Sequence, residues 1–181
     1  MFLSEDFVPV TYQRIESKEQ RHNDVMDAMR HYHKDLADAG VTVALLIASG
    51  PRDSHGELMG PAVSHGGYAA KAVVKITNLK DRAAGLEDVV LILDGDHIDE
   101  WTDREADAIY DHELAHPVLV LKKGKLVRDD LNRPKLRMRK HDGQFGWFFD
   151  VAERHKEHST EAQQLKEVGT IAVRQGWLQG F

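Results

Sequence analysis

The sequence predicts an α+β fold in which a small mixed β-sheet packs against helices. Apolar residues recur at helical spacing in several segments, near 18–39, 103–116, 143–155 and 160–175. Short apolar or alternating runs typical of strands lie between them, at 42–48, 69–77, 89–95, 118–128 and 135–140. The chain has 181 residues, of which 41% are hydrophobic, so we expect one domain over residues 1–181 with a sizeable core.

The N-terminal region is expected to hold an arm followed by a helix. Residues 1–16 show no clear periodicity and predict an irregular arm or a short strand. Ser17 and Gln20 have the spacing of a capping box, in which each side chain satisfies a backbone N–H at a helix start. Gly40 is a typical stop signal. We therefore expect a helix from about 18 to 39.

The middle of the chain is expected to supply the strands of the sheet. TVALLIA (42–48) is a short apolar run typical of a buried strand, and AAKAVVKIT (69–77) and VVLILDG (89–95) are similar. The segment between the first two, residues 49–67, is rich in Gly, Ser and Pro, so it predicts a loop or a loose hairpin.

A capped helix and a basic hairpin follow. Thr102 and Glu105 form a second capping box, and Pro117 breaks the helical pattern that runs from about 103 to 116. The next segment predicts two strands around a Lys-Gly-Lys turn (118–128). A half-buried strand and two further helices are expected after it, at 135–140, 143–155 and 160–175.

Composition limits the class of protein. The chain has no cysteine, which excludes disulfides and thiolate-bound metals, so any metal must be held by His, Asp or Glu. The start, MFLSEDF, has no basic region ahead of an apolar run, unlike a secretory signal. The longest apolar run, at 41–48, is too short to cross a bilayer. We therefore expect a cytoplasmic protein without membrane contact.

The stretch DHELAHP (111–117) has the pattern of a hydrolytic metal site. His112 and His116 are four residues apart, so on a helix both imidazoles lie on one face and can bind one zinc ion. Glu113 follows the first histidine and projects toward the same cavity, where it can take a proton from the metal-activated water. The pattern therefore predicts His112 and His116 as ligands and Glu113 as the general base.

A catalytic zinc needs a third protein ligand. His141 is the favoured candidate because it precedes a new aromatic-rich helix and can be directed back toward the first two histidines. Asp142 and Glu153 are the alternatives. His155 and His158 lie in a polar helix end, so we expect both to be solvated.

Supporting groups are less specific in the sequence. A ligating imidazole usually donates its other N–H to a carboxylate or carbonyl, and Asp111, Asp142 and Asp150 could accept it. Peptide hydrolysis also needs a group that stabilises the oxyanion, for which the candidates are Tyr68, His97 and Tyr110. Each of these residues also has an ordinary use in the core or on the surface.

Two segments carry a resemblance to known proteins. IYDHELAHP (109–117) and KHDGQFGWFFDVAERH (140–155) resemble the SprT-like zinc metallopeptidases and, more closely, the putative phage metallopeptidase family. The resemblance covers roughly residues 20–155. It implies a single zincin-like domain, Zn²⁺ as the cofactor and His141 as the third ligand. It would also place the protein in the host cytoplasm if a phage encodes it.

One departure keeps the alternative ligands open. Phe145 comes one residue earlier than in the family pattern, so Asp142 and Glu153 remain candidates beside His141. The final helix, within residues 159–181, extends beyond the resemblance. From position in the resemblance alone, strand 69–77 is the edge along which an extended substrate is expected to bind.

Motif and resemblance together predict a zinc-dependent metallopeptidase that acts on a protein or peptide. The alternative is a zinc-stabilised phage structural or binding protein without catalytic activity. Residues 122–140 carry nine Lys or Arg against two Asp, a charge of +7 in a chain of net charge −6. That segment is expected to be a solvated cationic face or a weak contact for nucleic acid.

Overall fold

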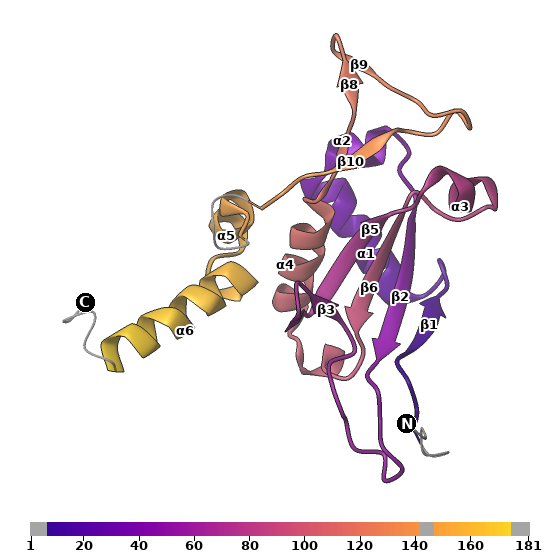
Figure 1. The fold of residues 1–181 in the computed structure, drawn as a ribbon. Helices are drawn as coiled ribbons and strands as arrows, with labels where there is room; N and C mark the ends of the chain where they lie inside the picture. The colour runs from indigo at the N-terminus through magenta and orange to yellow at the C-terminus, as the bar shows by residue number, and fades with distance from the viewer. Residues whose placement is uncertain (1–6, 142–146, 175–181) are drawn as a thin grey trace.

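The structure, a computed structural model, describes residues 7–141 and 147–174. Its centre is a four-stranded sheet with the order β1 (Thr11–Ile15), β2 (Val43–Ser49), β6 (Val89–Asp94) and β5 (Ala72–Ile76). The two central strands run parallel, whereas β1 and β5 pair antiparallel at the edges. The predicted α+β class with a small mixed sheet is therefore confirmed (Figure 1).

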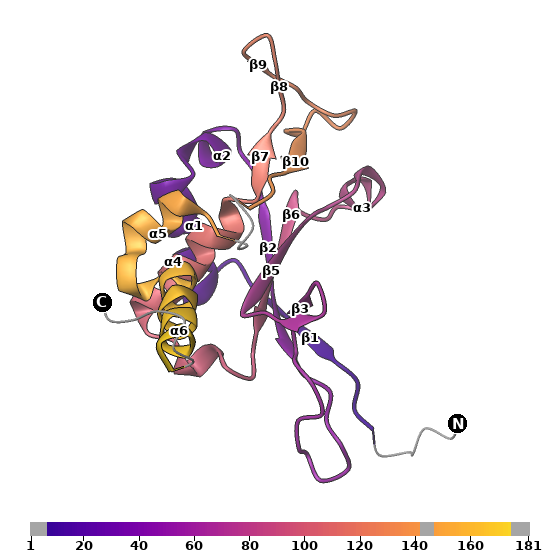
Figure 2. The ribbon, with the colours of Figure 1, turned by 60° about the vertical axis from the view of Figure 1, so that its left-hand side comes forward.

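Two long helices cover one face of this sheet. They are α1 (Gln20–Tyr32) and α4 (Asp103–Leu114), which pack against each other. Figure 2 shows them on the same side of the sheet as α5 (Phe149–His155) and α6 (Thr160–Arg174). Burial of apolar side chains between helices and sheet drives this packing. The core includes Val25, Met29, Leu45, Leu91, Leu93, Ile109 and Leu114.

Short elements complete the described chain. The short helices are α2 (Lys34–Asp38), α3 (Leu79–Ala83), η1 (Ile98–Glu100) and η2 (Lys156–His158). Three two-stranded ladders are formed by β3 (Ser64–His65) with β4 (Tyr68–Ala69), β7 (Pro117–Leu119) with β10 (Leu136–Met138), and β8 (Leu121–Lys122) with β9 (Lys125–Leu126). Within the described residues, no helix combines the length and apolar character needed to span a membrane.

Of the two helix starts predicted from capping boxes, one is confirmed and the other is wrong. The box at Ser17 is wrong: α1 has Glu19 at its N-cap, and no side chain caps the helix. The Thr102 box is confirmed, because Thr102 accepts from the Glu105 N–H and the Glu105 side chain accepts from the Thr102 N–H. The helix expected over 18–39 is also divided at His33, whose backbone leaves the helical region between α1 and α2.

The structure refines or confirms several further expectations for helices and strands. Of residues 1–16, the short-strand alternative holds for Thr11–Ile15, which forms the edge strand β1. The helix expected over 143–155 begins at Phe149 in the structure, and residues 142–146 lie outside the described part. Helix α6 agrees with the expectation for 160–175. The strands expected at 42–48 and 89–95 are confirmed within one residue at each end.

Candidate metal centre

Three histidines converge at the C-terminal end of α4. One ring nitrogen from each of His112, His116 and His141 lies within 4.8 Å of the other two. The Nε2 atoms of His112 and His141 are 3.2 Å apart. His112 is in the last turn of α4, while His116 lies in the turn beyond it because the helix ends at Leu114. The structure thus brings together the three predicted ligands.

A short antiparallel ladder returns the chain to this point. Strand β7 begins directly after His116 and pairs with β10, so that Met138 lies opposite Pro117. Beyond this pair, the Arg139 N–H donates to the His116 carbonyl at 2.6 Å. Because paired strands hold a fixed register, the residue two positions after Arg139 arrives beside His116. This explains how His141, distant in sequence, reaches the other two imidazoles.

The Nδ1 atoms of two histidines are held by protein acceptors. Nδ1 of His112 donates to Oε1 of Glu161 at 2.6 Å, and Nδ1 of His116 donates to the Arg139 carbonyl at 2.9 Å. Both acceptors lack a proton of their own, so each Nδ1 carries the hydrogen. This tautomer leaves the Nε2 lone pair of each ring free to bind a metal.

A buried phenylalanine forms the floor of the cluster. The ring of Phe148 has no exposed surface, and its centroid lies 5.0 Å, 4.9 Å and 5.0 Å from those of His112, His116 and His141. The guanidinium of Arg139 covers the same ring at 4.8 Å. Close packing of this kind restricts rotation of the imidazoles.

Glu113 is buried beside the histidines. Burial raises the pKa of Glu113 to about 7, although the charge on His112 and a hydrogen bond from the Val74 backbone N–H act in the opposite direction. A carboxyl with this pKa exchanges protons with water at neutral pH. Its position on α4 next to His112 agrees with the arrangement predicted from the HELAH pattern.

The local environment separates the pKa values of the two helix-end histidines. Burial, reinforced by the neighbouring charges of His112 and His141, lowers the pKa of His116 to about 4. His116 is therefore neutral at neutral pH, the form that binds metal. For His112, burial lowers the pKa, but the hydrogen bond to Glu161 and the charge of Glu113 outweigh it, so the pKa is raised.

The cluster opens into a cleft of about 430 Å³. Residues from the start of β5 line one wall and residues of α6 line the other, among them Ala72, Val74, Thr160, Gln163 and Gln164. The two walls touch where Nζ of Lys71 donates to Gln163 at 3.1 Å. His65 of the β3–β4 hairpin also lines the cleft, a residue that the sequence did not single out.

The alternative ligands have different positions. Glu153 is exposed on α5 and does not belong to the cluster, and Asp142 lies outside the described residues. The expectation that His155 is solvated is wrong: its side chain is 7% exposed, and its Nε2 lies 2.8 Å from Oδ2 of Asp111. His158 is partly exposed beside Arg104.

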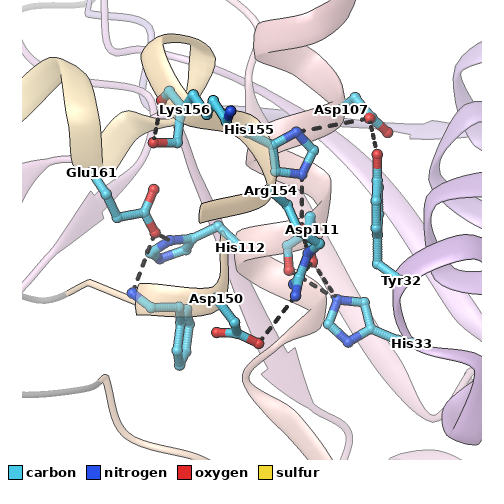
Figure 3. A network of polar contacts seen from close by, with 12 residues as sticks. Tyr32, His33, Asp107, Asp111, His112, Asp150, Arg154, His155, Lys156 and Glu161 are labelled. Atoms are coloured by element: carbon cyan, nitrogen blue, oxygen red, sulfur yellow. Dashed lines mark hydrogen bonds and ion pairs between the residues drawn. The ribbon is translucent and has the colours of Figure 1, made fainter. Parts of the chain in front are cut away.

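The supporting carboxylate is one that the sequence did not indicate. Asp111 was one candidate to accept from a ligating imidazole, but its carboxylate bonds instead to His33, Arg154 and His155 (Figure 3). Asp150 pairs with Arg154 at 3.3 Å. Glu161 takes the expected role on His112, from the helix that extends beyond the resemblance. No local pattern links a helix N-terminal glutamate to a histidine 49 residues away.

None of the three candidate oxyanion groups lines the cleft. Tyr110 is buried in the core, and its hydroxyl accepts a bond from Arg21 at 3.4 Å. Tyr68 is 80% exposed. His97 is exposed and paired with Glu100 at 3.3 Å. The described geometry therefore gives no support to an oxyanion role for these residues.

Some of the basic residues in segment 122–140 form ion pairs within the fold, and others are exposed. Figure 1 shows the β8–β9 hairpin projecting away from the sheet, and its residues Lys122, Lys123 and Lys125 are exposed. Arg133, by contrast, pairs with the buried Asp88 at 2.8 Å. Part of the +7 charge therefore stabilises the fold, and part faces solvent.

Comparison with known proteins gives one result. A family model described as "Putative phage metallopeptidase" matches residues 11–170, which include the HELAH helix, His141 and Glu161. No curated protein and no solved structure matches the chain. The match extends beyond the resemblance seen in residues 20–155 and takes in the first part of α6. The chain therefore belongs to the putative phage metallopeptidase family.

Proposed function

We propose that this protein is a zinc-dependent peptidase of the HExxH type. His112, His116 and His141 hold the metal, and Glu113 is the general base. The observation that carries the proposal is the convergence of three imidazoles beside a buried glutamate, at the base of a cleft. Three protein ligands with a remaining open position are typical of catalytic zinc. Among the described residues, no fourth His, Asp or Glu joins the group.

The spacing of the ring nitrogens fits one small ion. Two nitrogens bound at ~2.1 Å to a tetrahedral ion lie about 3.4 Å apart. The Nε2 atoms of His112 and His141 are separated by 3.2 Å. A hydrogen bond between two neutral imidazoles would account for that pair, but it gives no reason for His116 to converge on the same point. The fit supports a shared metal.

Glu113 would move the protons of the reaction. When bound, the metal supplies Lewis acidity, which activates a water molecule and polarises the carbonyl of the substrate. With a pKa of about 7, Glu113 can accept a proton from water and later deliver it to the leaving amine.

The outer edge of β5 offers a place for an extended peptide. The Lys71 carbonyl and the Thr77 N–H both bond toward β6. Because backbone groups alternate along a strand, those of Ala72, Val74 and Ile76 face the opposite, outer edge, where the Val74 N–H bonds to Glu113. Ala72 and Val74 also line the cleft. We therefore propose that a protein or peptide substrate pairs along this edge, as expected for segment 69–77.

Metal content is the first test of the proposal. The purified wild-type protein is expected to hold one zinc ion per chain, and His141→Ala is expected to lose it. Glu153→Gln is the matched control because Glu153 is exposed on α5. Retention of metal by His141→Ala together with loss by Glu153→Gln would transfer the third ligand role to Glu153 and contradict the assignment.

Turnover is the second test. Glu113→Gln keeps the size of the side chain but removes the base, so the variant is expected to hold zinc and to cleave no member of a quenched fluorescent peptide library. Wild-type protein that holds zinc and also cleaves nothing would favour the alternative, a zinc-stabilised phage structural or binding protein. The open cleft at Glu113 favours the enzyme.

A further inference from the structure

We propose that Glu161 is a positioning residue for the metal ligand His112, and that through it helix α6 is a working part of the metal centre. The inference rests on the proposed zinc site. It adds a residue that binds neither metal nor substrate, in a helix for which the sequence indicated no role. The contact between Glu161 and His112 is drawn in Figure 3.

The contact is short and buried. Oε1 of Glu161 accepts from Nδ1 of His112 at 2.6 Å, and the Glu161 side chain is 1% exposed. The same oxygen accepts a longer bond from the Phe148 N–H at 3.4 Å. A carboxylate can be buried without a large penalty only when strong partners compensate for the lost water. His112 is the strongest of these partners.

The second carboxylate oxygen of Glu161 is also buried. This atom, Oε2, has no hydrogen-bond partner among the described residues. A side chain that only accepts a bond from a backbone N–H does not need a negative charge, because a neutral side chain could accept the same bond at a lower desolvation cost. The short contact with Nδ1 of His112, rather than the longer backbone bond, therefore accounts for a buried carboxylate at this position.

A charge in this position acts on the metal ligand in two ways. It fixes the tautomer with hydrogen on Nδ1, so that Nε2 is presented toward His141. It also holds the ring orientation and increases the basicity of Nε2. The geometry is a carboxylate–histidine pair of the kind that supports metal sites, with the carboxylate supplied from the start of α6.

Contacts other than the Glu161–His112 bond also hold the N-terminal end of α6 in place. The Ser159 hydroxyl caps it by accepting from the Ala162 N–H at 3.0 Å. Gln163 then bonds to Lys71 at 3.1 Å and to Glu105 at 2.8 Å, which ties the helix to β5 and α4. Glu161 is therefore held against His112 by the docking of the whole first turn. By thermodynamic linkage, metal binding must in turn stabilise that docking.

The test measures zinc affinity of the metal-free full-length chain by competition with a chromophoric chelator. Glu161→Gln, which is nearly isosteric, is expected to bind zinc 10- to 100-fold more weakly than wild type. Glu161→Ala should lose at least as much. Glu157→Gln removes the same charge from an exposed position four residues earlier, and its affinity should match wild type. Circular dichroism of each metal-free variant checks that it is folded.

Hydrogen exchange provides a readout that a purely structural role would not move. Zinc is expected to slow exchange of the amides of residues 160–167 in wild type and in Glu157→Gln, but much less in Glu161→Gln. Equal zinc affinity and equal protection in wild type and Glu161→Gln would overturn the inference and leave the proposed function standing. Failure of wild type to bind zinc would overturn both.

Discussion

Arg154 donates two hydrogen bonds to the carboxylate of Asp111, from Nε at 2.9 Å and from Nη2 at 2.8 Å, although Asp111 directly precedes the first histidine of the candidate metal centre. The carboxylate points away from that centre and is fully buried. It also accepts from Nε2 of His33 at 2.8 Å and lies 2.8 Å from Nε2 of His155 (Figure 3). Asp111 thereby joins α4 to the α1–α2 junction and to α5.

Asp111→Asn is expected to destabilise the fold strongly. Removal of one partner from a buried charge cluster leaves the others uncompensated, which costs about 3–5 kcal/mol. The pKa of Asp111 is held far below its usual range because the bonds from His155, His33 and Arg154 outweigh burial, so the carboxylate is charged at neutral pH. Urea unfolding at pH 7 measures the difference.

Asp150→Asn is the matched control for that variant. Asp150 also pairs with Arg154, but its side chain is 48% exposed, so its loss should change the free energy of unfolding by less than about 0.5 kcal/mol. Equal stability of Asp111→Asn and Asp150→Asn would show that the cluster contributes nothing to holding α5 on α4.

The charge cluster around Asp111 also shows what could not be predicted from the sequence. Helix α4, its Thr102 cap and the HELAH spacing are local features, so they could be predicted. His155 could not, because its polar neighbours indicated solvent and its actual partner, Asp111, is 44 residues away. Whether a charge is buried depends on the tertiary packing, and its cationic partners can come from segments that are distant in the sequence.

The candidate metal site was likewise predictable only in part. The pair His112 and His116 was predicted from helical spacing, whereas His141, whose position depends on the β7–β10 ladder, was favoured by its place before an aromatic-rich helix and by the resemblance. Glu161 had an ordinary explanation in the sequence, since acidic residues are common in the first turn of a helix. Only the packing of α6 against α4 makes it a partner of His112.

The buried Glu113 is expected to make the metal-free protein less stable as pH rises. Its folded-state pKa is about 7, above the ordinary value of 4.5 for a glutamate. Between these values the folded state binds more protons than the unfolded state, so stability falls with increasing pH and the loss is complete above pH 7. The cost then reaches about 3 kcal/mol.

Comparison with Glu113→Gln isolates this effect. With a chelator present, the variant should gain about 3 kcal/mol on wild type between pH 4 and pH 8, because glutamine does not ionise. Urea unfolding at each pH gives the two free energies. A difference between wild type and variant that stays constant across this range would mean that Glu113 is not desolvated in the folded protein.

Phe148 and Phe149 are adjacent but should differ in their response to substitution by leucine. Phe148 is fully buried under the three imidazoles, whereas Phe149 is 61% exposed. Phe148→Leu is expected to lower stability by about 1–3 kcal/mol and to weaken zinc binding, because the rings lose their floor. Phe149→Leu should do neither. Thermal unfolding and zinc titration check both, and equal zinc affinity in the two variants would contradict the role of Phe148.

The exposed lysines of the β8–β9 hairpin lead to a last prediction, which concerns nucleic acid. The net charge of −6 opposes broad binding, so we expect only weak, salt-sensitive association of duplex DNA with the tip that carries Lys122, Lys123 and Lys125. Replacement of all three by glutamine should weaken binding and reduce the slope of log K against log salt by up to about 3. Stability should not change, because these side chains are exposed.

The control for this variant makes the same charge change elsewhere on the surface. It replaces three exposed lysines outside the hairpin with glutamine, at Lys18, Lys34 and Lys80. A nonspecific effect of net charge would weaken DNA binding equally in both triple variants, whereas a contact at the hairpin would weaken only the first. Fluorescence anisotropy at two salt concentrations separates these outcomes. Arg133 is bound to Asp88, whereas the three hairpin lysines are exposed and can contact a partner.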